Sequence, residues 1–331
     1  MNAPATVEAT VETLRGPVPA DGLGRVLIHE HVFIMDVEYS CNYRPDAFAD
    51  ETIAAAADRL NALKATGIDT IVDLTVLGIG RHVPNFVRLA PLTDLNIIVS
   101  TGIYTFDEVP RPFQYYGPGL IKDPGFEPMV GHFVRDITEG IGGTAIRAGM
   151  LKCAIDEPGL KPGVERIMRA IGQAHVATGA PVTVHTAPRS ETGRDVQRVL
   201  AEEGVDLSRV VIGHCGDTTD TDYLMELADR GSLLGMDRFG VEWGITLEQR
   251  VATIAEMVRR GYAGSLALSH DCCSWSDLFP DIADYHAAMP NHHYLHIHND
   301  VLPALREAGV SEADLDRMFV DNPRRLFSRE S

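Results

Sequence analysis

The chain alternates eight times between a short β-branched apolar segment and, in most cases, a longer segment with the apolar spacing of an amphipathic helix. Several of the short segments, such as VVIG and LAL, are apolar on both faces, which is typical of strands in a buried parallel sheet. This alternation predicts an α/β fold, a (β/α)8 TIM barrel, with an open doubly wound sheet as the alternative. We expect strands at 26–28, 70–74, 96–100, 148–153, 182–185, 210–214, 233–236 and 266–269. We expect helices at 51–66, 127–140, 163–178, 196–203, 220–230, 247–260, 299–308 and 312–327.

No Ser-, Gly- or Pro-rich linker divides the 331 residues, so a single domain over 1–331 is expected, with 1–8 as a flexible segment. A small N-terminal hairpin is expected within 8–25. Irregular stretches follow the third, seventh and eighth strands, at 104–126, 237–246 and 271–291. In a barrel, loops that follow strands lie at the mouth, so these three stretches are predicted to contact the substrate.

Composition and charge exclude several classes of protein. Lys and Arg total 29 and Asp and Glu total 47, and the net charge of −18 opposes binding to nucleic acid. No apolar run approaches the ~20 residues that a membrane span needs, and residues 1–10 lack the basic region of a secretory signal. The five cysteines include no C-x-x-C pair, so no disulfide framework is expected. A cytoplasmic protein without nucleic-acid or membrane partners is predicted.

Polar residues gather where the predicted strands end. His29 and His31 follow the first strand, and residues two apart on a strand face the same side, so both can bind one ion while Glu30 points away. Strands four, five, six and eight end in Lys152, His185, His214 and Asp271. The strand ends of a barrel share one face, where active sites form. Four imidazoles and a carboxylate favour Zn, Fe, Co or Mn over Ca or Mg.

Some of these residues also have simpler interpretations. A single histidine at a strand end is more often a packing residue than a ligand, so the metal prediction depends on the joint pattern. A buried Lys152 needs a partner, and it could be a Schiff-base lysine or a lysine bound to an electrophile. The five histidines between 286 and 298 and the adjacent Cys272 and Cys273 are predicted to be structural.

Sequence motifs over nearly the whole chain carry a resemblance to a known family. They are GRVLIHEHVF, TIVDLT, TGIYTF, LKCAIDEPG, RVVIGHCGD, GMDRFG, LSHD and NPRRLF. Together with the residues at the strand ends, they resemble the phosphotriesterase family of the amidohydrolase superfamily. Within that family the chain is most similar to the phosphotriesterase-like lactonases, the quorum-quenching enzymes that hydrolyse N-acyl-homoserine lactones.

The resemblance implies a binuclear centre of two divalent metal ions, with zinc favoured. The more buried metal would be held by His29, His31 and Asp271. The more exposed metal would be held by His185 and His214. Lys152 would be carboxylated by carbon dioxide to N6-carboxylysine and would bridge both metals, with a hydroxide as the second bridge. A neutral amine has one lone pair, whereas a carbamate has two anionic oxygens and can span two dications.

The resemblance also implies roles in catalysis and substrate binding. Asp271 would take the proton of the bridging hydroxide, Tyr104 would border that hydroxide, and Arg238 would lie near the leaving group. The loops after strands seven and eight would supply the residues that contact the substrate: Phe239, Val241, Trp243, Trp275 and Leu278. A neutral lactone needs no basic pocket, which agrees with the acidic chain.

The implied function is hydrolysis of a small-molecule lactone or ester, foremost an N-acyl-homoserine lactone, with weak organophosphate triesterase side activity. The resemblance also leads us to expect a homodimer. Three alternatives stay open. The chain could be a phosphotriesterase in its main activity, a metal-free Schiff-base lyase that uses Lys152, or a non-catalytic metal-binding scaffold.

Overall fold

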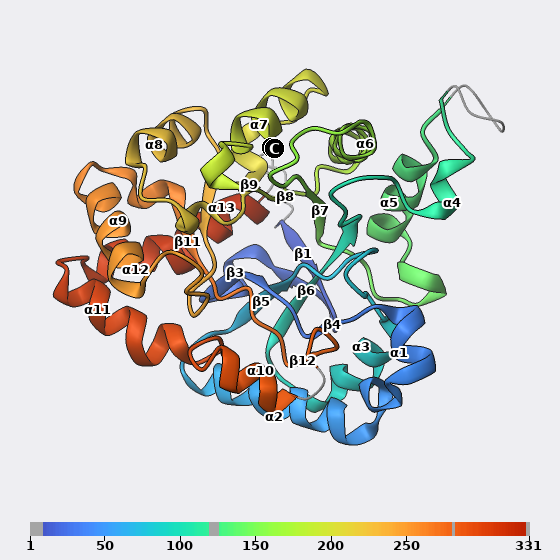
Figure 1. Cartoon of the computed structure of the whole chain (residues 1–331), viewed down its shortest axis with the longest axis horizontal. Helices are drawn as coiled ribbons and strands as arrows, with labels where there is room; N and C mark the ends of the chain where they lie inside the picture. The colour runs from blue at the N-terminus through green and yellow to red at the C-terminus, as the bar shows by residue number, and fades with distance from the viewer. Residues whose placement is uncertain (1–8, 119–125, 280–281, 329–331) are drawn as a thin grey trace, which may run out of the picture.

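Eight parallel strands in chain order form the centre of the molecule (Figure 1). The computed structural model describes residues 9–118, 126–279 and 282–328. Each strand pairs in parallel with the next one along the chain. The strands are β3 (Val26–Glu30), β5 (Thr70–Asp73), β6 (Asn96–Gly102), β7 (Met150–Ala154), β8 (Val182–His185), β9 (Val210–Ile212), β10 (Leu233–Met236) and β11 (Leu266–Leu268).

The first and last strands of this sheet are joined by hydrogen bonds just beyond the end of β11. The Asp271 backbone N–H donates to the His29 carbonyl oxygen over 3.1 Å, and the His29 N–H donates to Ser269 Oγ over 2.9 Å. These contacts close the sheet into a barrel, which confirms the predicted (β/α)8 fold over the open sheet.

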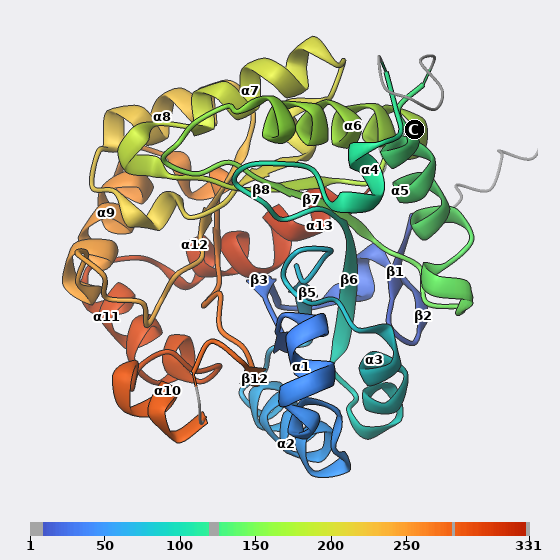
Figure 2. The same ribbon diagram turned by 45° about the vertical axis from the view of Figure 1, so that its right-hand side comes forward.

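Helices surround the barrel on its outer side (Figures 1 and 2). The longer ones agree with the predicted positions to within three residues at each end: α2 (Asp50–Ala65), α5 (Pro128–Thr138), α6 (Pro162–Thr178), α7 (Gly193–Glu202), α8 (Thr221–Asp229) and α9 (Leu247–Arg259). The last two predicted helices contain π-helical turns and are divided into Ile297–Val301, α11 (Leu302–Glu307), α12 (Glu312–Asp316), Arg317–Asp321 and α13 (Asn322–Phe327).

The structure also contains short elements that the sequence did not predict. The helices are α1 (Val37–Tyr43), α3 (Val83–Leu89), α4 (Arg111–Gln114) and α10 (Ile282–Ala288), and two-residue strands β4 (Phe33–Ile34) and β12 (Trp275–Ser276) pair in parallel. Each of these helices has at most two turns, which is too short for an apolar period to be recognised. Their formation depends on packing against the rest of the molecule.

The end of the barrel opposite the strand carboxyl ends is filled with apolar side chains. The predicted hairpin is present, with β1 (Thr10–Thr13) antiparallel to β2 (Gly16–Pro19). Val11 of this hairpin and Phe327 of α13 belong to the same core as Ile28 and Ile98 inside the barrel. Because this end is apolar and closed, polar strand-end residues gather at the other end. The proposed flexible segment 1–8 lies outside the described residues, and the single domain stays a prediction.

Two further expectations concern the whole chain. No helix in the described ranges combines the length and apolarity needed to cross a membrane. All five cysteines are free thiols in the structure.

Candidate metal centre

Two imidazoles and a carboxylate meet where the first and last strands of the barrel end. His29 lies near the end of β3 and His31 directly follows that strand, and their Nε2 atoms lie 3.2 and 3.1 Å from Oδ1 of Asp271. Asp271 follows β11 in a left-handed backbone conformation with φ of 57°. The other ring nitrogen of His31 lies 2.8 Å from Thr75 Oγ1, which fixes the orientation of the ring. These three side chains form a group that can hold a metal ion.

A second pair of imidazoles lies next to the first group. His185 Nδ1, at the end of β8, is 2.7 Å from Nε2 of His214, which follows β9. The outer nitrogens face carboxylates, with His214 Nδ1 3.0 Å from Asp237 and His185 Nε2 3.3 Å from Asp156. When both outer nitrogens donate to these carboxylates, the two facing nitrogens present lone pairs to each other. A cation held by both nitrogens would stabilise that arrangement.

Lys152 lies on β7 and lines one cavity together with His29, His31 and His185. The side chain is almost fully buried, and Nζ has no hydrogen-bond partner among the described residues. Burial lowers the pKa of Lys152 to about 8, so part of the population carries a neutral amine near neutral pH. A buried amine without a partner is unfavourable by itself. Its position among side chains of the metal-binding type fits a lysine that carries an anionic modification.

Burial also keeps His185 and His214 neutral. It lowers the pKa of His185 to about 4 and the pKa of His214 well below its ordinary value. Neutral imidazole is the form that binds metals. Burial opposes ionisation of Asp271, but the neighbouring imidazoles and the Arg238 guanidinium hold its pKa well below the usual range. The site therefore offers neutral nitrogens and an anionic oxygen at neutral pH.

Two further predicted residues contact this centre. The Arg238 guanidinium donates through Nε to Asp271 Oδ2 and through its terminal nitrogen to Asp217 Oδ2, each over 3.0 Å. The Tyr104 hydroxyl lies 3.5 Å from His185 Nδ1. Burial raises the pKa of Tyr104, so its phenol stays protonated and can donate a hydrogen bond at neutral pH.

A cavity of about 450 Å³ opens over the centre. His29, His31, Lys152, His185 and Asp271 form its polar end together with Tyr104 and Arg238. The rest of the lining is largely apolar, and three residues predicted to contact the substrate belong to it: Val241, Trp243 and Leu278. Trp243 and Leu278 are each 71% exposed, so they stand at the rim of the cavity.

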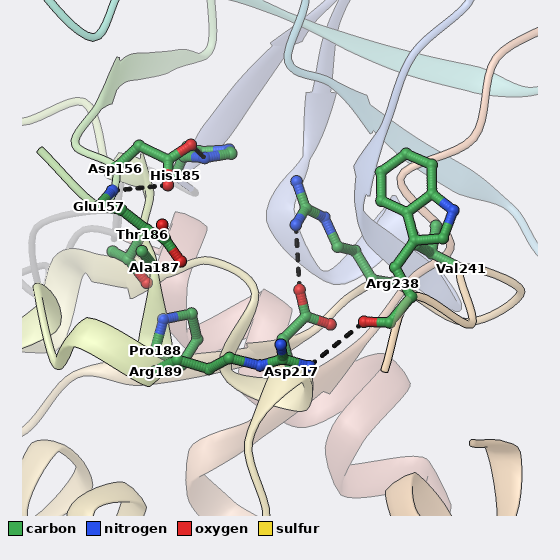
Figure 3. Close-up of a pocket in the computed structure, with 11 residues that line it drawn as sticks. Asp156, Glu157, His185, Thr186, Ala187, Pro188, Arg189, Asp217, Arg238 and Val241 are labelled. Carbon is green, nitrogen blue, oxygen red and sulfur yellow. Dashed lines mark hydrogen bonds and ion pairs between the residues drawn. The ribbon is translucent and has the colours of Figure 1, made fainter. Parts of the chain in front are cut away.

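A second cavity, of about 240 Å³, adjoins the first and is drawn in Figure 3. His185, Arg238, Val241 and Trp243 line both cavities. The remaining lining of the second cavity is mostly polar and includes Asp156, Glu157, Arg189 and Asp217. The centre therefore lies between an apolar space and a polar one.

Two residues predicted to contact the substrate lie elsewhere. Phe239 is 1% exposed and packs in the core between the barrel and its helices. Trp275 is buried in β12, where its Nε1–H donates to Asp46 over 3.3 Å and the Arg44 guanidinium lies 5.1 Å from its ring centroid. Among the described residues, neither side chain is found in the lining of the two cavities, and contact of Phe239 and Trp275 with the substrate stays a prediction. Tertiary packing buries both aromatic rings.

The sequence analysis missed the residues that contact and orient the candidate ligands or Arg238. They are Thr75, Asp156, Asp217 and Asp237. Only Asp237 had a usable signal, because it is an acidic residue directly after the apolar strand LLGM. A carboxylate at a buried strand end needs partners, and histidines from neighbouring strands supply them.

The histidine-rich segment is held by contacts within the protein fold. His292 Nδ1 lies 2.7 Å from the Tyr285 hydroxyl, and its Nε2 lies 2.9 Å from the His270 carbonyl oxygen. His296 Nδ1 lies 2.8 Å from Asp300. Glu30 faces away from the centre and accepts hydrogen bonds from His270 and from the backbone after β11. These contacts agree with the structural interpretation of that segment.

Comparisons with known proteins now add to the geometry. The model of the phosphotriesterase family matches residues 9–327. The phosphotriesterase homology protein of Mycobacterium tuberculosis (strain CDC 1551 / Oshkosh) is 55% identical over 322 residues, 97% of this chain and 98% of the relative. A solved structure of the phosphotriesterase from Mycobacterium tuberculosis superposes with a TM-score of 0.93 at 55% identity, covering 97% of this chain and 98% of that chain. The aryldialkylphosphatase of Saccharolobus solfataricus is 33% identical over 94% of this chain and 97% of the relative. The chain belongs to the phosphotriesterase family, whose members are metal-dependent hydrolases.

Proposed function

We propose that this chain is a binuclear-metal hydrolase that opens lactone rings, with N-acyl-homoserine lactones as the foremost substrates. One observation carries the proposal: five of the ligand-type residues line a cavity of about 450 Å³ whose other walls are largely apolar. A lactone with an acyl tail matches this cavity, because its reacting ring is polar and its chain is apolar.

The metal site would use the residues that the barrel brings together. His29, His31 and Asp271 would hold one divalent ion, and His185 and His214 would hold the other. Lys152, carboxylated on Nζ, would serve both. Zinc suits this set of nitrogen and oxygen donors, and iron, cobalt and manganese are the alternatives. When bound, such ions supply water activated at neutral pH and polarise a substrate carbonyl.

The chain's own residues would handle the proton and orient the substrate. Asp271 is anionic at neutral pH and would accept the proton of the attacking water. The Arg238 guanidinium, 3.0 Å from Asp271, would hold that carboxylate and neutralise charge near the leaving oxygen. Tyr104 would donate a hydrogen bond from its protonated phenol to the bound ring.

The apolar walls of the cavity favour a substrate with an apolar tail. Val241, Trp243 and Leu278 would pack against the acyl chain, together with Met35 and Met289 on the facing walls. Burial of each methylene of the chain contributes about 0.8 kcal/mol. Affinity should therefore rise with acyl-chain length until the cavity is filled.

A second candidate is hydrolysis of organophosphate triesters. Its support is the 33% identity to a relative named aryldialkylphosphatase. Phosphotriesters are neutral, as lactones are, and the same centre could attack phosphorus. We expect this activity to be the weaker one.

Metal analysis combined with a substrate panel tests the proposal. The purified protein is analysed for bound metal, and acid release is measured with lactones of increasing chain length and with one phosphate triester. We expect two divalent ions per chain and faster turnover of lactones than of the triester. Faster turnover of the triester would make phosphotriester hydrolysis the main activity and lactone hydrolysis the weaker one. Bound metal without turnover of any ester would support the alternative of a non-catalytic metal-binding scaffold. Borohydride trapping of Lys152 with a carbonyl compound would support the alternative of a Schiff-base lyase.

A further inference from the structure

We propose that Asp237 is a positioning residue that couples the two halves of the metal centre by fixing which nitrogen of His29 and of His214 can bind a metal. This inference rests on the proposed function. Asp237 follows β10 and is fully buried. Its Oδ2 lies 2.7 Å from His29 Nδ1, and its Oδ1 lies 3.0 Å from His214 Nδ1. One carboxylate therefore contacts one candidate ligand from each half.

The chemistry of a carboxylate makes this contact directional. An ionised carboxylate only accepts hydrogen bonds, so both Nδ1 atoms must carry the hydrogen. The lone pairs of His29 and His214 are then on Nε2. His29 Nε2 faces Asp271 at 3.2 Å, and His214 Nε2 faces His185 at 2.7 Å. Asp237 thus directs the metal-binding nitrogen of each ring towards the other ligands of its own half.

The same carboxylate supports the backbone of one ligand. His214 has a left-handed conformation with φ of 63°, which is strained for a residue other than glycine. Its backbone N–H donates to Asp237 Oδ1 over 2.8 Å. Asp237 therefore fixes both the ring and the backbone of His214.

The local sequence leaves space for this carboxylate. A Cβ atom on Gly235 would lie 2.4 Å from Asp237 Oδ2, which is closer than atoms can approach. Gly235 is thus required for Asp237 to reach His29. Among the described residues, Asp237 contacts the His29 and His214 rings and forms no ion pair with a lysine or arginine. Its charge is directed at the two imidazoles, not at a separate structural ion pair.

An Asp237→Asn substitution separates the two halves. The amide keeps one acceptor oxygen and gains an NH2 group, which cannot accept from an Nδ1–H. One of the two rings must then move its hydrogen to Nε2 and lose its metal-binding lone pair. We expect the variant to bind one Zn²⁺ as the parent does and to bind the second about 10–100-fold more weakly.

The experiment titrates metal-stripped protein with Zn²⁺ and measures stoichiometry and affinity together with thermal unfolding. Asp300→Asn is the matched control, because Asp300 also contacts a histidine Nδ1 at 2.8 Å but lies outside the centre. Asp300→Asn should bind two Zn²⁺ with parent affinity. Gly235→Ala, which keeps the carboxylate but displaces it, should weaken one site as Asp237→Asn does. Two sites of parent affinity in both Asp237→Asn and Gly235→Ala would overturn the inference.

Nitrogen NMR of the zinc-loaded parent protein provides a test that needs no variant. Both His29 and His214 should carry hydrogen on Nδ1, and an Nε2–H form of either ring would overturn the inference. These outcomes are distinguishable from failure of the proposed function. A parent protein that binds no divalent ion would contradict the proposed metal centre itself, whereas a parent that binds two ions without lactone turnover would leave the inference on Asp237 standing.

Discussion

The floor and the mouth of the candidate centre differ in how they are held. The floor consists of the strand-end residues His29, His31, Lys152, His185 and His214 with Asp237 behind them, and none of these is more than 5% exposed. The mouth consists of Val241, Trp243 and Leu278 on the loops after β10 and β11, where Trp243 and Leu278 are 71% exposed.

This difference indicates which residues determine the chemistry and which determine the preference among substrates. Floor residues lie on or next to buried strands, and the His29 and His214 rings donate hydrogen bonds to the buried Asp237, so a change there alters ligand geometry. Of the mouth residues, Trp243 and Leu278 are largely exposed and can change without disturbing the centre. Substitutions in the floor should therefore affect metal content and turnover, and substitutions in the mouth should affect the preference among substrates.

The largest effect is expected for Lys152→Ala. Removal of the amine eliminates the group proposed to serve both metals, so bound metal and turnover should fall together, with kcat lower by roughly 10³-fold or more. Metal analysis and the lactone assay measure both quantities. Lys161→Ala, at a partly exposed lysine that pairs with Asp107, should leave both unchanged. Parent-like turnover in Lys152→Ala would show that the floor does not depend on this residue.

Asp271→Asn should come next. The amide cannot accept the proton of the attacking water, so kcat should fall about 10²- to 10⁴-fold. The fold should be retained because the amide keeps the shape of the side chain, and the thermal midpoint should fall only by the loss of the ion pair with Arg238. Asp195→Asn, at an exposed carboxylate paired with Arg198, is the control. An unchanged kcat in Asp271→Asn would show that a residue other than Asp271 accepts the proton.

Acid should destabilise the metal-stripped floor before the mouth. Burial lowers the pKa of His185 to about 4, whereas the unfolded chain titrates near 6.5. The unfolded state binds more protons between these values, so stability is fully present above pH 6.5 and falls as pH drops towards 4. His185 alone should account for about 3 kcal/mol. Urea unfolding at several pH values measures this slope, and the slope should shrink in His185→Asn.

Arg238→Ala tests the boundary between floor and mouth. Loss of the guanidinium frees Asp271 and Asp217, so kcat/KM for lactones should fall about 10- to 100-fold. Thermal stability should change less, because the side chain lines both cavities and is not part of the core. Arg189→Ala, on the polar cavity, should leave metal binding unchanged. A large loss of stability in Arg238→Ala would place Arg238 among the structural residues.

The smallest effect is expected at the rim. Trp243→Ala and Leu278→Ala each remove an apolar contact worth about 1 kcal/mol, so KM for a long-chain lactone should rise about fivefold. KM for a short-chain lactone and the metal content should not change. Equal effects on both lactones would contradict a chain-binding role for the mouth.

Much of the fold could be predicted because its strands and longer helices follow from the local spacing of apolar residues. Short apolar runs followed by amphipathic segments indicated β8 and α6 with nearly their observed bounds. The strand predicted at 210–214 was too long, because the backbone of His214 turns to a left-handed conformation after Ile212. Short helices such as α3 and α10 were missed, since two turns carry too few apolar residues to reveal a period.

The candidate ligands could be predicted from residue type and strand ends, whereas their supports could not. His29 and Asp237 are 208 positions apart, and no local pattern pairs them. Trp275 and Phe239 looked suited to a substrate channel by position, but packing buries both. Side-chain direction in a loop depends on neighbours that come from elsewhere in the chain.

By itself, the sequence determined the eight strands, the placement of metal-type side chains after them and the family resemblance, because these depend on spacing along the chain. The tertiary structure alone decided that Lys152 Nζ is buried without a partner among the described residues, that one carboxylate contacts both halves of the centre, and that the cavity is apolar on one side. Such features depend on distances between distant residues, which exist only once the barrel has closed.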